Sequence, residues 1–326
     1  MVVSVGRRPE SVPIPGPPPG ALPSAPRRKG RIPPQEWYPA GVPGVESSFL
    51  TLPDGERVRV LTSGSSTAPP VVLVHGWACS AYSWRRQLPA LAEGGFRALA
   101  VDLRGHGLSD RPAAAEAYTA EAMTTFLDSV LTALHPGRVA LVGHSLGAGV
   151  ATRLALRRPE RVARLVVIGG VGFGRIPMIP LLRGVPDALA RPFLPISASR
   201  ALFRLVLKMV GGPDQYSSRD LDEYWAATQF PEFTLSLWQL IRHFDWTELT
   251  EEERGRLIIP HLLLFGGRDR LVRSPVSSVA PGSSADGGDV VLAGVGHAIQ
   301  EEAPEQVNRL LLSFLEPWMN EAAGTG

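Results

Sequence analysis

The clearest chemical signal in the sequence is the motif G-x-S-x-G at residues 143–147. It directly follows the apolar run Val139–Val142 and precedes a helical pattern, which is the context of a nucleophile elbow. So tight a turn needs neighbours without side chains, and we therefore expect Gly143 and Gly147 to be structural turn residues. Ser145 would then adopt a strained backbone conformation with its hydroxyl held above a sheet, as a catalytic nucleophile requires.

A serine hydroxyl needs a base, and the base needs a carboxylate to orient it. Asp269 follows the apolar run Leu262–Phe265 and a Gly-Gly pair, and His297 stands in a glycine-rich loop after the run Val290–Leu292. The order Ser, Asp, His along the chain is the one that accompanies this elbow. Because the carboxyl ends of parallel strands gather at one edge of a sheet, we predict a catalytic triad of Ser145, Asp269 and His297.

Acyl transfer through a serine also needs two N–H donors for the oxyanion. The backbone N–H of Leu146, directly after the serine, is the first candidate. The second is the N–H of Trp77, in the loop after the apolar run Val71–Val74. Gly76 permits the bend that turns this N–H inward, so it is a third expected structural turn residue. His75 is expected to hold the loop by hydrogen bonds rather than to act as the base.

Residues 102–109 form a second glycine-rich turn, Asp-Leu-Arg-Gly-His-Gly-Leu-Ser. The turn lacks the lysine and the glycine spacing of a phosphate loop, so we expect a structural turn. Asp102 and His106 would then contact residues of the active site rather than the substrate. Three further histidines, His135, His243 and His261, have no partners at the spacing of metal ligands. We therefore predict neither a metal nor a cofactor.

The elements that must position these residues alternate between strand and helix from residue 46 onward. Such alternation predicts an α/β fold with a doubly wound, mostly parallel sheet. The expected strands are Val58–Leu61, Val71–Val74, Ala98–Val101, Val139–Val142, Leu165–Ile168, Leu262–Phe265 and Val290–Leu292. The expected helices are Trp84–Glu93, Ala120–Leu134, Leu146–Arg157 and Glu305–Phe314.

Three kinds of segment are expected. Residues 46–171 and 257–320 would form the core, and residues 172–256, which show no strand run, would form an inserted helical cap. Residues 1–45 hold 12 of the 31 prolines and are expected to be a disordered leader, or else a docking arm for a proline-binding partner or an anionic surface.

Composition narrows the function further. The 326 residues carry a formal net charge of +2, of which the leader contributes +4, so nucleic acid is not an expected partner. The single Cys79 excludes an internal disulfide. No apolar run is long enough for a transmembrane helix and no signal-peptide core is visible, so we expect a soluble cytoplasmic protein. Its oligomeric state is left open.

Taken together, these motifs resemble the α/β-hydrolase fold family, in particular serine hydrolases with a helical cap, over about residues 46–320. The resemblance implies the triad and the oxyanion hole named above. The His-Gly-Trp form at residues 75–77 is similar to carboxylesterases. Serine at position 145 departs from epoxide hydrolases and haloalkane dehalogenases, which carry aspartate there, so those activities are not expected.

The expected function is therefore hydrolysis of uncharged, fairly hydrophobic carboxylic esters through an acyl-enzyme. Hydrolysis of C–C bonds or thioesters, and acyl transfer, remain alternatives with the same triad, as does a non-catalytic ligand receptor. Few charge clusters are expected in the cap, which argues against a highly charged substrate. Aromatic and aliphatic side chains of the cap either pack it onto the core or line an acyl pocket, for which the candidates are Phe203, Leu207, Trp225, Phe230 and Trp238.

Overall fold

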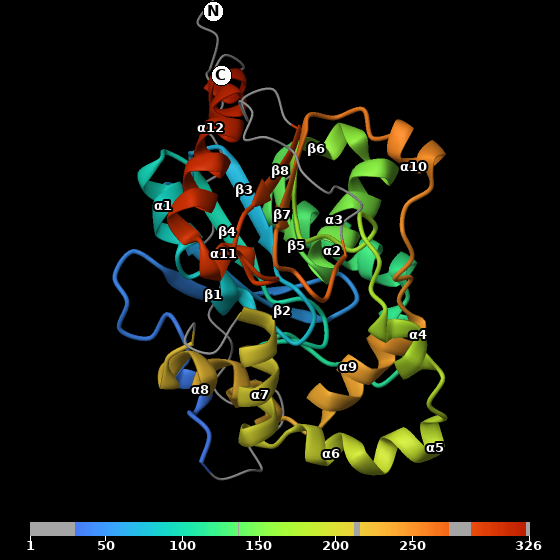
Figure 1. Ribbon diagram of the computed structural model, residues 1–326. Helices are drawn as coiled ribbons and strands as arrows, with labels where there is room; N and C mark the ends of the chain where they lie inside the picture. Colours follow the sequence, from blue (N-terminus) through green and yellow to red (C-terminus); the bar gives the residue numbers. More distant parts are fainter. Residues whose placement is uncertain (1–29, 136, 212–215, 274–287, 324–326) are drawn as a thin grey trace, which may run out of the picture.

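A sheet of eight strands runs through the centre of the molecule, with helices on both of its faces (Figure 1). The computed structural model describes residues 30–135, 137–211, 216–273 and 288–323. The strand order is β1-β2-β4-β3-β5-β6-β7-β8. The strands are β1 Glu46–Thr51, β2 Arg57–Ser63, β3 Pro70–Val74, β4 Arg97–Val101, β5 Val139–His144, β6 Val162–Ile168, β7 His261–Gly266 and β8 Gly288–Leu292.

The sheet is mostly parallel, as the alternating pattern predicts. Only β1 and β2 run antiparallel to their neighbours, and every pairing from β4 to β8 is parallel. Strand β1 was not expected from the sequence. Its first residues are polar and exposed, because it is an edge strand of which only Leu50 is buried.

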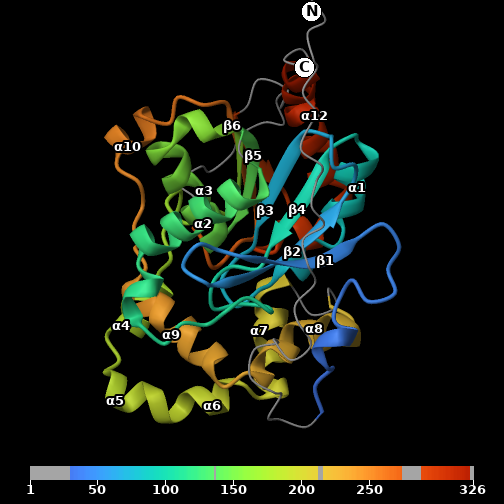
Figure 2. The ribbon, with the colours of Figure 1, turned by 180° about the vertical axis from the view of Figure 1, so that it is seen from behind.

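The central strands are buried on both faces, which explains their continuously apolar sequences. Every residue of β3 and β6 is buried. Along β3, Val72 and Val74 face one hydrophobic cluster, whereas Val71 and Leu73 face the other. Helices α2 and α3 cover the first face, and α1 and α12 cover the second (Figure 2). Their bounds are α1 Gln87–Glu93, α2 Ala120–Leu134, α3 Leu146–Arg157 and α12 Pro304–Ala323.

Helices α2 and α3 match their predicted bounds. The helix expected over Trp84–Glu93 is instead a 3-10 turn, Ala81–Trp84, followed by α1. The last helix extends well beyond the expected Glu305–Phe314, and α11 (Ile299–Glu302) precedes it. None of the described helices is long and apolar enough to cross a bilayer.

Between β6 and β7 the described residues form helices and connecting segments, which we call the helical insertion (residues 172–256). An isolated bridge joins Arg175 to Arg273 at its base. Most of the insertion, residues 178–211 and 218–243, lies below the sheet in Figure 1, at the edge where the parallel strands end, whereas residues 251–255 lie at the upper right. Its helices are α4 Met178–Arg183, α5 Asp187–Ala190, α6 Leu194–Ser197, α7 Arg200–Gly211, α8 Ser218–Ala226, α9 Glu232–His243 and α10 Glu251–Gly255.

The chain is packed earlier than the expected boundary at residue 46. Residues 1–29 lie outside the described part, but residues 30–45, which we call the N-terminal strap, lie against the insertion and the core. Trp37 is buried with its ring edge-on to Phe230, and the N–H of Tyr38 donates to Glu223 at 2.9 Å. Arg59 donates to the carbonyl of Tyr38. The proline count concealed this packing, which buries the apolar side chains of Trp37 and Val45.

Candidate active site

Ser145 stands at the turn between β5 and α3, where the motif predicts an elbow. Its φ is 52° and its ψ is −117°, a left-handed conformation that non-glycine residues rarely adopt. A Cβ at position 143 would collide with the backbone of Ala148, and one at position 147 would collide with the carbonyl of Val74. The glycines on both sides of Ser145 are therefore required for the turn to close.

The structure brings the three predicted catalytic residues together. The Ser145 Oγ atom lies 3.0 Å from His297 Nε2, and His297 Nδ1 lies 2.7 Å from Asp269 Oδ2. The other oxygen, Asp269 Oδ1, accepts the backbone N–H groups of Leu271 at 2.8 Å and Val272 at 3.0 Å. All three side chains are buried or nearly so.

Asp269 is held in its ionised form. Burial alone would raise the pKa of this carboxyl, but the hydrogen bond and charge interaction with His297 and the two backbone N–H groups outweigh it, so the pKa lies below its usual range. A carboxylate there keeps the proton of the imidazole on Nδ1. The lone pair of His297 Nε2 then faces the Ser145 hydroxyl.

The predicted oxyanion donors lie beside Ser145. Leu146 is the first residue of α3, and neither its N–H nor that of Trp77 has an acceptor among the described residues. The loop with Trp77 lies directly on the elbow, because a Cβ at position 76 would come 2.9 Å from His144 Nδ1 and 3.1 Å from Ser145 Cβ. The Trp77 indole donates to the carbonyl of Leu237 in α9 at 3.0 Å, which ties this loop to the helical insertion.

The turn at residues 102–109 supports the same loop. Asp102 accepts the N–H of Ala81 at 2.6 Å through one oxygen and that of Leu108 at 2.9 Å through the other. His106 Nε2 accepts the N–H of Ala78, whose φ of 60° is also left-handed. Burial, and then the charge of His75, hold the pKa of His106 well below its usual value, so His106 is neutral and can accept this bond.

His75 holds the start of the loop, as predicted. Its Nε2 atom accepts the N–H of Leu103 at 3.0 Å, and its Nδ1 atom lies 2.8 Å from the carbonyl of Gly76. The first contact leaves the proton on Nδ1, which then donates to Gly76. Both nitrogens are occupied, so His75 has no free site for a reacting group.

Sequence reasoning missed three groups that hold the backbone of His297. The His144 side chain lies 3.0 Å from the carbonyl of His297 through its Nε2 atom. The Glu302 carboxylate accepts the N–H groups on either side, from Gly296 at 2.7 Å and Ala298 at 3.0 Å. The N–H of His297 itself donates to the carbonyl of Val210 in α7 at 3.3 Å. The contacts with His144 and Val210 join segments far apart in the sequence, and those of Glu302 depend on the shape of the turn before α11, so no residue spacing predicts them.

His144 is a neutral, fully enclosed side chain. Burial, followed by the neighbouring charge of His297, lowers the pKa of His144 to about 3. The carbonyl of His297 can only accept, so His144 Nε2 carries the proton. Its Nδ1 atom is buried without a hydrogen-bond partner among the described residues.

The five candidate pocket residues do not form one group. Phe230 and Phe203 belong to a small cluster with Trp37, whereas Trp238 is part of the main core and donates to Asp187. The remaining two residues also lie apart from this cluster. The Trp225 indole donates to Ala198 beneath the guanidinium of Arg31, and Leu207 lines a cavity between α7 and α8.

Three comparisons bear on this geometry. Residues 69–304 match the family model of the alpha/beta hydrolase fold. Epoxide hydrolase A of Mycobacterium tuberculosis is 30% identical to this chain, over 83% of this chain and 98% of the relative. A non-heme chloroperoxidase of Streptomyces lividans is 29% identical, over 82% and 99%.

Solved structures give the same picture of the fold. The crystal structure of epoxide hydrolase A from Mycobacterium thermoresistibile superposes with a TM-score of 0.66 at 25% identity, and the match covers 83% of this chain and 98% of that chain. The strand order, the turn at Ser145 and these matches all indicate the same fold. The chain belongs to the α/β-hydrolase fold family.

Proposed function

We propose that this protein is a serine esterase that hydrolyses carboxylic esters through an acyl-enzyme. His297 Nε2 takes the proton of Ser145 Oγ as that oxygen attacks the ester carbonyl. The N–H groups of Trp77 and Leu146 stabilise the resulting oxyanion. The imidazolium then gives its proton to the departing alcohol. Water, deprotonated by His297, attacks the acyl-enzyme, and collapse of this second tetrahedral intermediate releases the acid and restores Ser145.

The observation that carries this proposal is the hydrogen-bonded line from Asp269 through His297 to Ser145. The His297–Asp269 and His297–Ser145 distances, 2.7 Å and 3.0 Å, are hydrogen-bond lengths along which a proton can be transferred. The carboxylate of Asp269 at the end of this line is ionised. A serine nucleophile, an imidazole base and the two N–H groups proposed for the oxyanion together support hydrolysis of a carboxylic ester. Thioester hydrolysis, C–C hydrolysis and acyl transfer would use the same triad.

Epoxide hydrolysis is the second candidate, because several of the relatives are named epoxide hydrolases. The residue at the elbow weighs against it, since Ser145 stands where those enzymes carry aspartate. A serine alkoxide that opened an epoxide would leave an ether, which water does not hydrolyse under mild conditions. An aspartate would leave an ester that water can cleave.

The apolar surroundings favour an uncharged, fairly hydrophobic ester. Trp77 and Ala78 pack against a cluster that includes Leu108, Phe233 and Leu237. Such a wall would stabilise an alkyl or aryl group and would penalise an unpaired charge.

The test compares p-nitrophenyl acetate and butyrate with styrene oxide, in wild type and in Ser145→Ala. We expect ester turnover in wild type, a loss of roughly 10⁴–10⁶-fold in Ser145→Ala, and no epoxide turnover. Ser65→Ala, which changes an exposed serine, is the matched control and should retain full activity. Epoxide turnover without ester turnover would overturn the proposal in favour of the second candidate.

A further inference from the structure

Large apolar side chains are exposed along the first half of the helical insertion, from α4 to α7. Of the eleven large hydrophobic residues that are exposed in the described part of the chain, nine fall between residues 178 and 206. Leu189, Phe193 and Ile196 are 61%, 63% and 61% exposed. Helices α5 and α6, which carry or flank them, form the edge of the molecule opposite the C-terminus in both views (Figures 1 and 2). We call residues 178–208 the docking face; its apolar members are Met178, Leu181, Val185, Leu189, Phe193, Ile196, Leu202, Leu205 and Val206.

The same segment is strongly basic, so the expectation of few charge clusters in the cap is wrong. Residues 178–211 contain five basic side chains and one acidic side chain, a net charge of +4. Residues 212–256 contain four basic and ten acidic side chains, a net charge of −6. The small net charge of the whole chain does not reveal that the insertion is divided into a cationic half and an anionic half.

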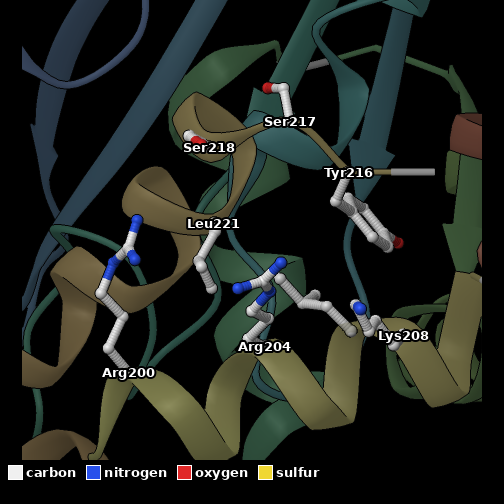
Figure 3. Close-up of a pocket in the computed structure, with 8 residues that line it drawn as sticks. Arg200, Arg204, Lys208, Tyr216, Ser217, Ser218 and Leu221 are labelled. Atoms are coloured by element: carbon white, nitrogen blue, oxygen red, sulfur yellow. The ribbon is translucent and has the colours of Figure 1, made fainter. Parts of the chain in front are cut away.

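Helix α7 shows how the two kinds of side chain are arranged. Arg200, Arg204 and Lys208 recur every four residues along one side of the helix and, with Ser217 and Ser218, line a cavity beside α8 (Figure 3). Asp222 pairs with Arg200 at 2.8 Å. Arg204 and Lys208 have no ion-pair partner among the described residues.

At 3.6 residues per turn, the apolar members of α7 lie on other sides of the helix than these three basic side chains. Leu202, Leu205 and Val206 are open to solvent over a third or more of their surface. A helix with exposed apolar side chains and a basic polar side has the composition of segments that lie in the interface of a bilayer.

We propose that the docking face binds the surface of an anionic phospholipid bilayer. Leu189, Phe193 and Ile196 would enter the boundary between headgroups and acyl chains, while Arg204 and Lys208 would contact lipid phosphates. The positive charge of the face favours an anionic bilayer over a second copy of the chain. Two copies of the face in a symmetric dimer would bring like charges together, whereas an anionic bilayer would complement them. Apolar patches of this kind on a monomer mark an interaction surface.

The face is connected to the candidate active site. Helix α7 ends at the loop of the proposed base, where the carbonyl of Val210 accepts the N–H of His297. Docking would therefore place the site next to a reservoir of hydrophobic esters. That consequence rests on the proposed function, but bilayer binding does not.

The test measures co-sedimentation of the full chain with vesicles of phosphatidylcholine that contain about a third phosphatidylglycerol. Pure phosphatidylcholine vesicles are the neutral comparison. We expect binding to the anionic vesicles that weakens with added salt, and little binding to neutral ones.

Two pairs of variants separate the face from the rest of the chain. Leu189→Ser with Phe193→Ser should weaken binding at least about tenfold. Arg204→Gln with Lys208→Gln should weaken it by about fivefold per lost charge. The matched controls are Ile258→Ser, which changes a side chain 80% exposed elsewhere, and Arg256→Gln with Arg309→Gln; both should bind as wild type does.

Three results would overturn the proposal. One is no binding of wild type to anionic vesicles. Another is equal binding by the face variants and the controls, which would assign the affinity to another basic segment such as residues 1–29. The third is a dimer in solution that the face variants dissociate, which would make a second copy the occupant. Turnover of the water-soluble p-nitrophenyl acetate, measured in parallel, should be unchanged in the face variants, so a failure of this proposal is distinct from a failure of the esterase proposal.

Discussion

The side chain of His144 donates to the main-chain carbonyl of His297 across 3.0 Å, so the residue next to the proposed nucleophile holds the loop of the proposed base. The two rings lie 4.9 Å apart, and His144 remains neutral beside a histidine that must accept a proton during catalysis. A second charge at this position would oppose that proton transfer. His144 therefore has two effects on His297: its hydrogen bond holds the loop in place, and its lack of charge leaves His297 free to accept a proton.

Replacing His144 should separate these two effects from mere packing. His144→Leu removes the donor and should lower kcat roughly ten- to hundredfold, because the imidazole of His297 loses its fixed position. His144→Gln keeps an N–H near the Nε2 position and should recover most of this loss. The measurement is kcat and KM for an aryl ester across pH; equal losses in both variants would show that the hydrogen bond to His297 is not what matters.

The buried, neutral state of His144 should also be visible in stability. Its pKa is about 3 in the folded protein and about 6.5 when unfolded, so between these values the unfolded chain binds one more proton. Stability must therefore fall as pH falls below about 6.5, by up to about 1.4 kcal/mol per pH unit from this residue alone. Denaturant unfolding should show a shallower decline in His144→Gln than in wild type between about pH 6 and 4. Parallel curves would contradict the assignment.

The oxyanion loop should tolerate no side chain at position 76. A Cβ on Gly76 would press on His144 and on Ser145 Cβ, and the loop would have to move the N–H of Trp77 away from the substrate. We expect Gly76→Ala to lower kcat by about 10²–10³, the usual cost of one lost oxyanion donor. Gly255→Ala, where the added methyl meets no atom within 4 Å, is the control and should leave activity intact. Full activity in Gly76→Ala would remove Trp77 from the mechanism.

The N-terminal strap should stabilise the folded protein through Trp37. This indole is buried, packs edge-on to Phe230 and donates to Ile32 at 3.0 Å. We expect Trp37→Ala to lower the free energy of unfolding by about 3–5 kcal/mol, whereas Val42→Ala, at a position 40% exposed, should change it little. Equal stability of the two variants would mean that the strap adds nothing to the fold.

The sequence predicted what is decided locally. The elbow of Ser145, the central strands and the chain order of Asp269 and His297 follow from short patterns with a physical cause. Strand β1 was missed because an edge strand needs little apolar surface, and its sequence begins Glu-Ser-Ser. The contacts of Glu302 and Val210 with the His297 loop join segments far apart or depend on the shape of a turn, so no spacing reveals them. The aromatic residues of the insertion gave no information on whether they pack or line a pocket, because both roles select the same side chains.

The most direct test of the proposed mechanism is to trap the acyl-enzyme. Wild type mixed rapidly with excess p-nitrophenyl acetate should release nitrophenol in a burst equal to the enzyme concentration, and peptide mass spectrometry of acid-quenched protein should find the acetyl group on Ser145. We predict both the burst and the adduct in wild type and neither in Ser145→Ala. An adduct on another residue, or ester turnover that survives in Ser145→Ala, would contradict the mechanism.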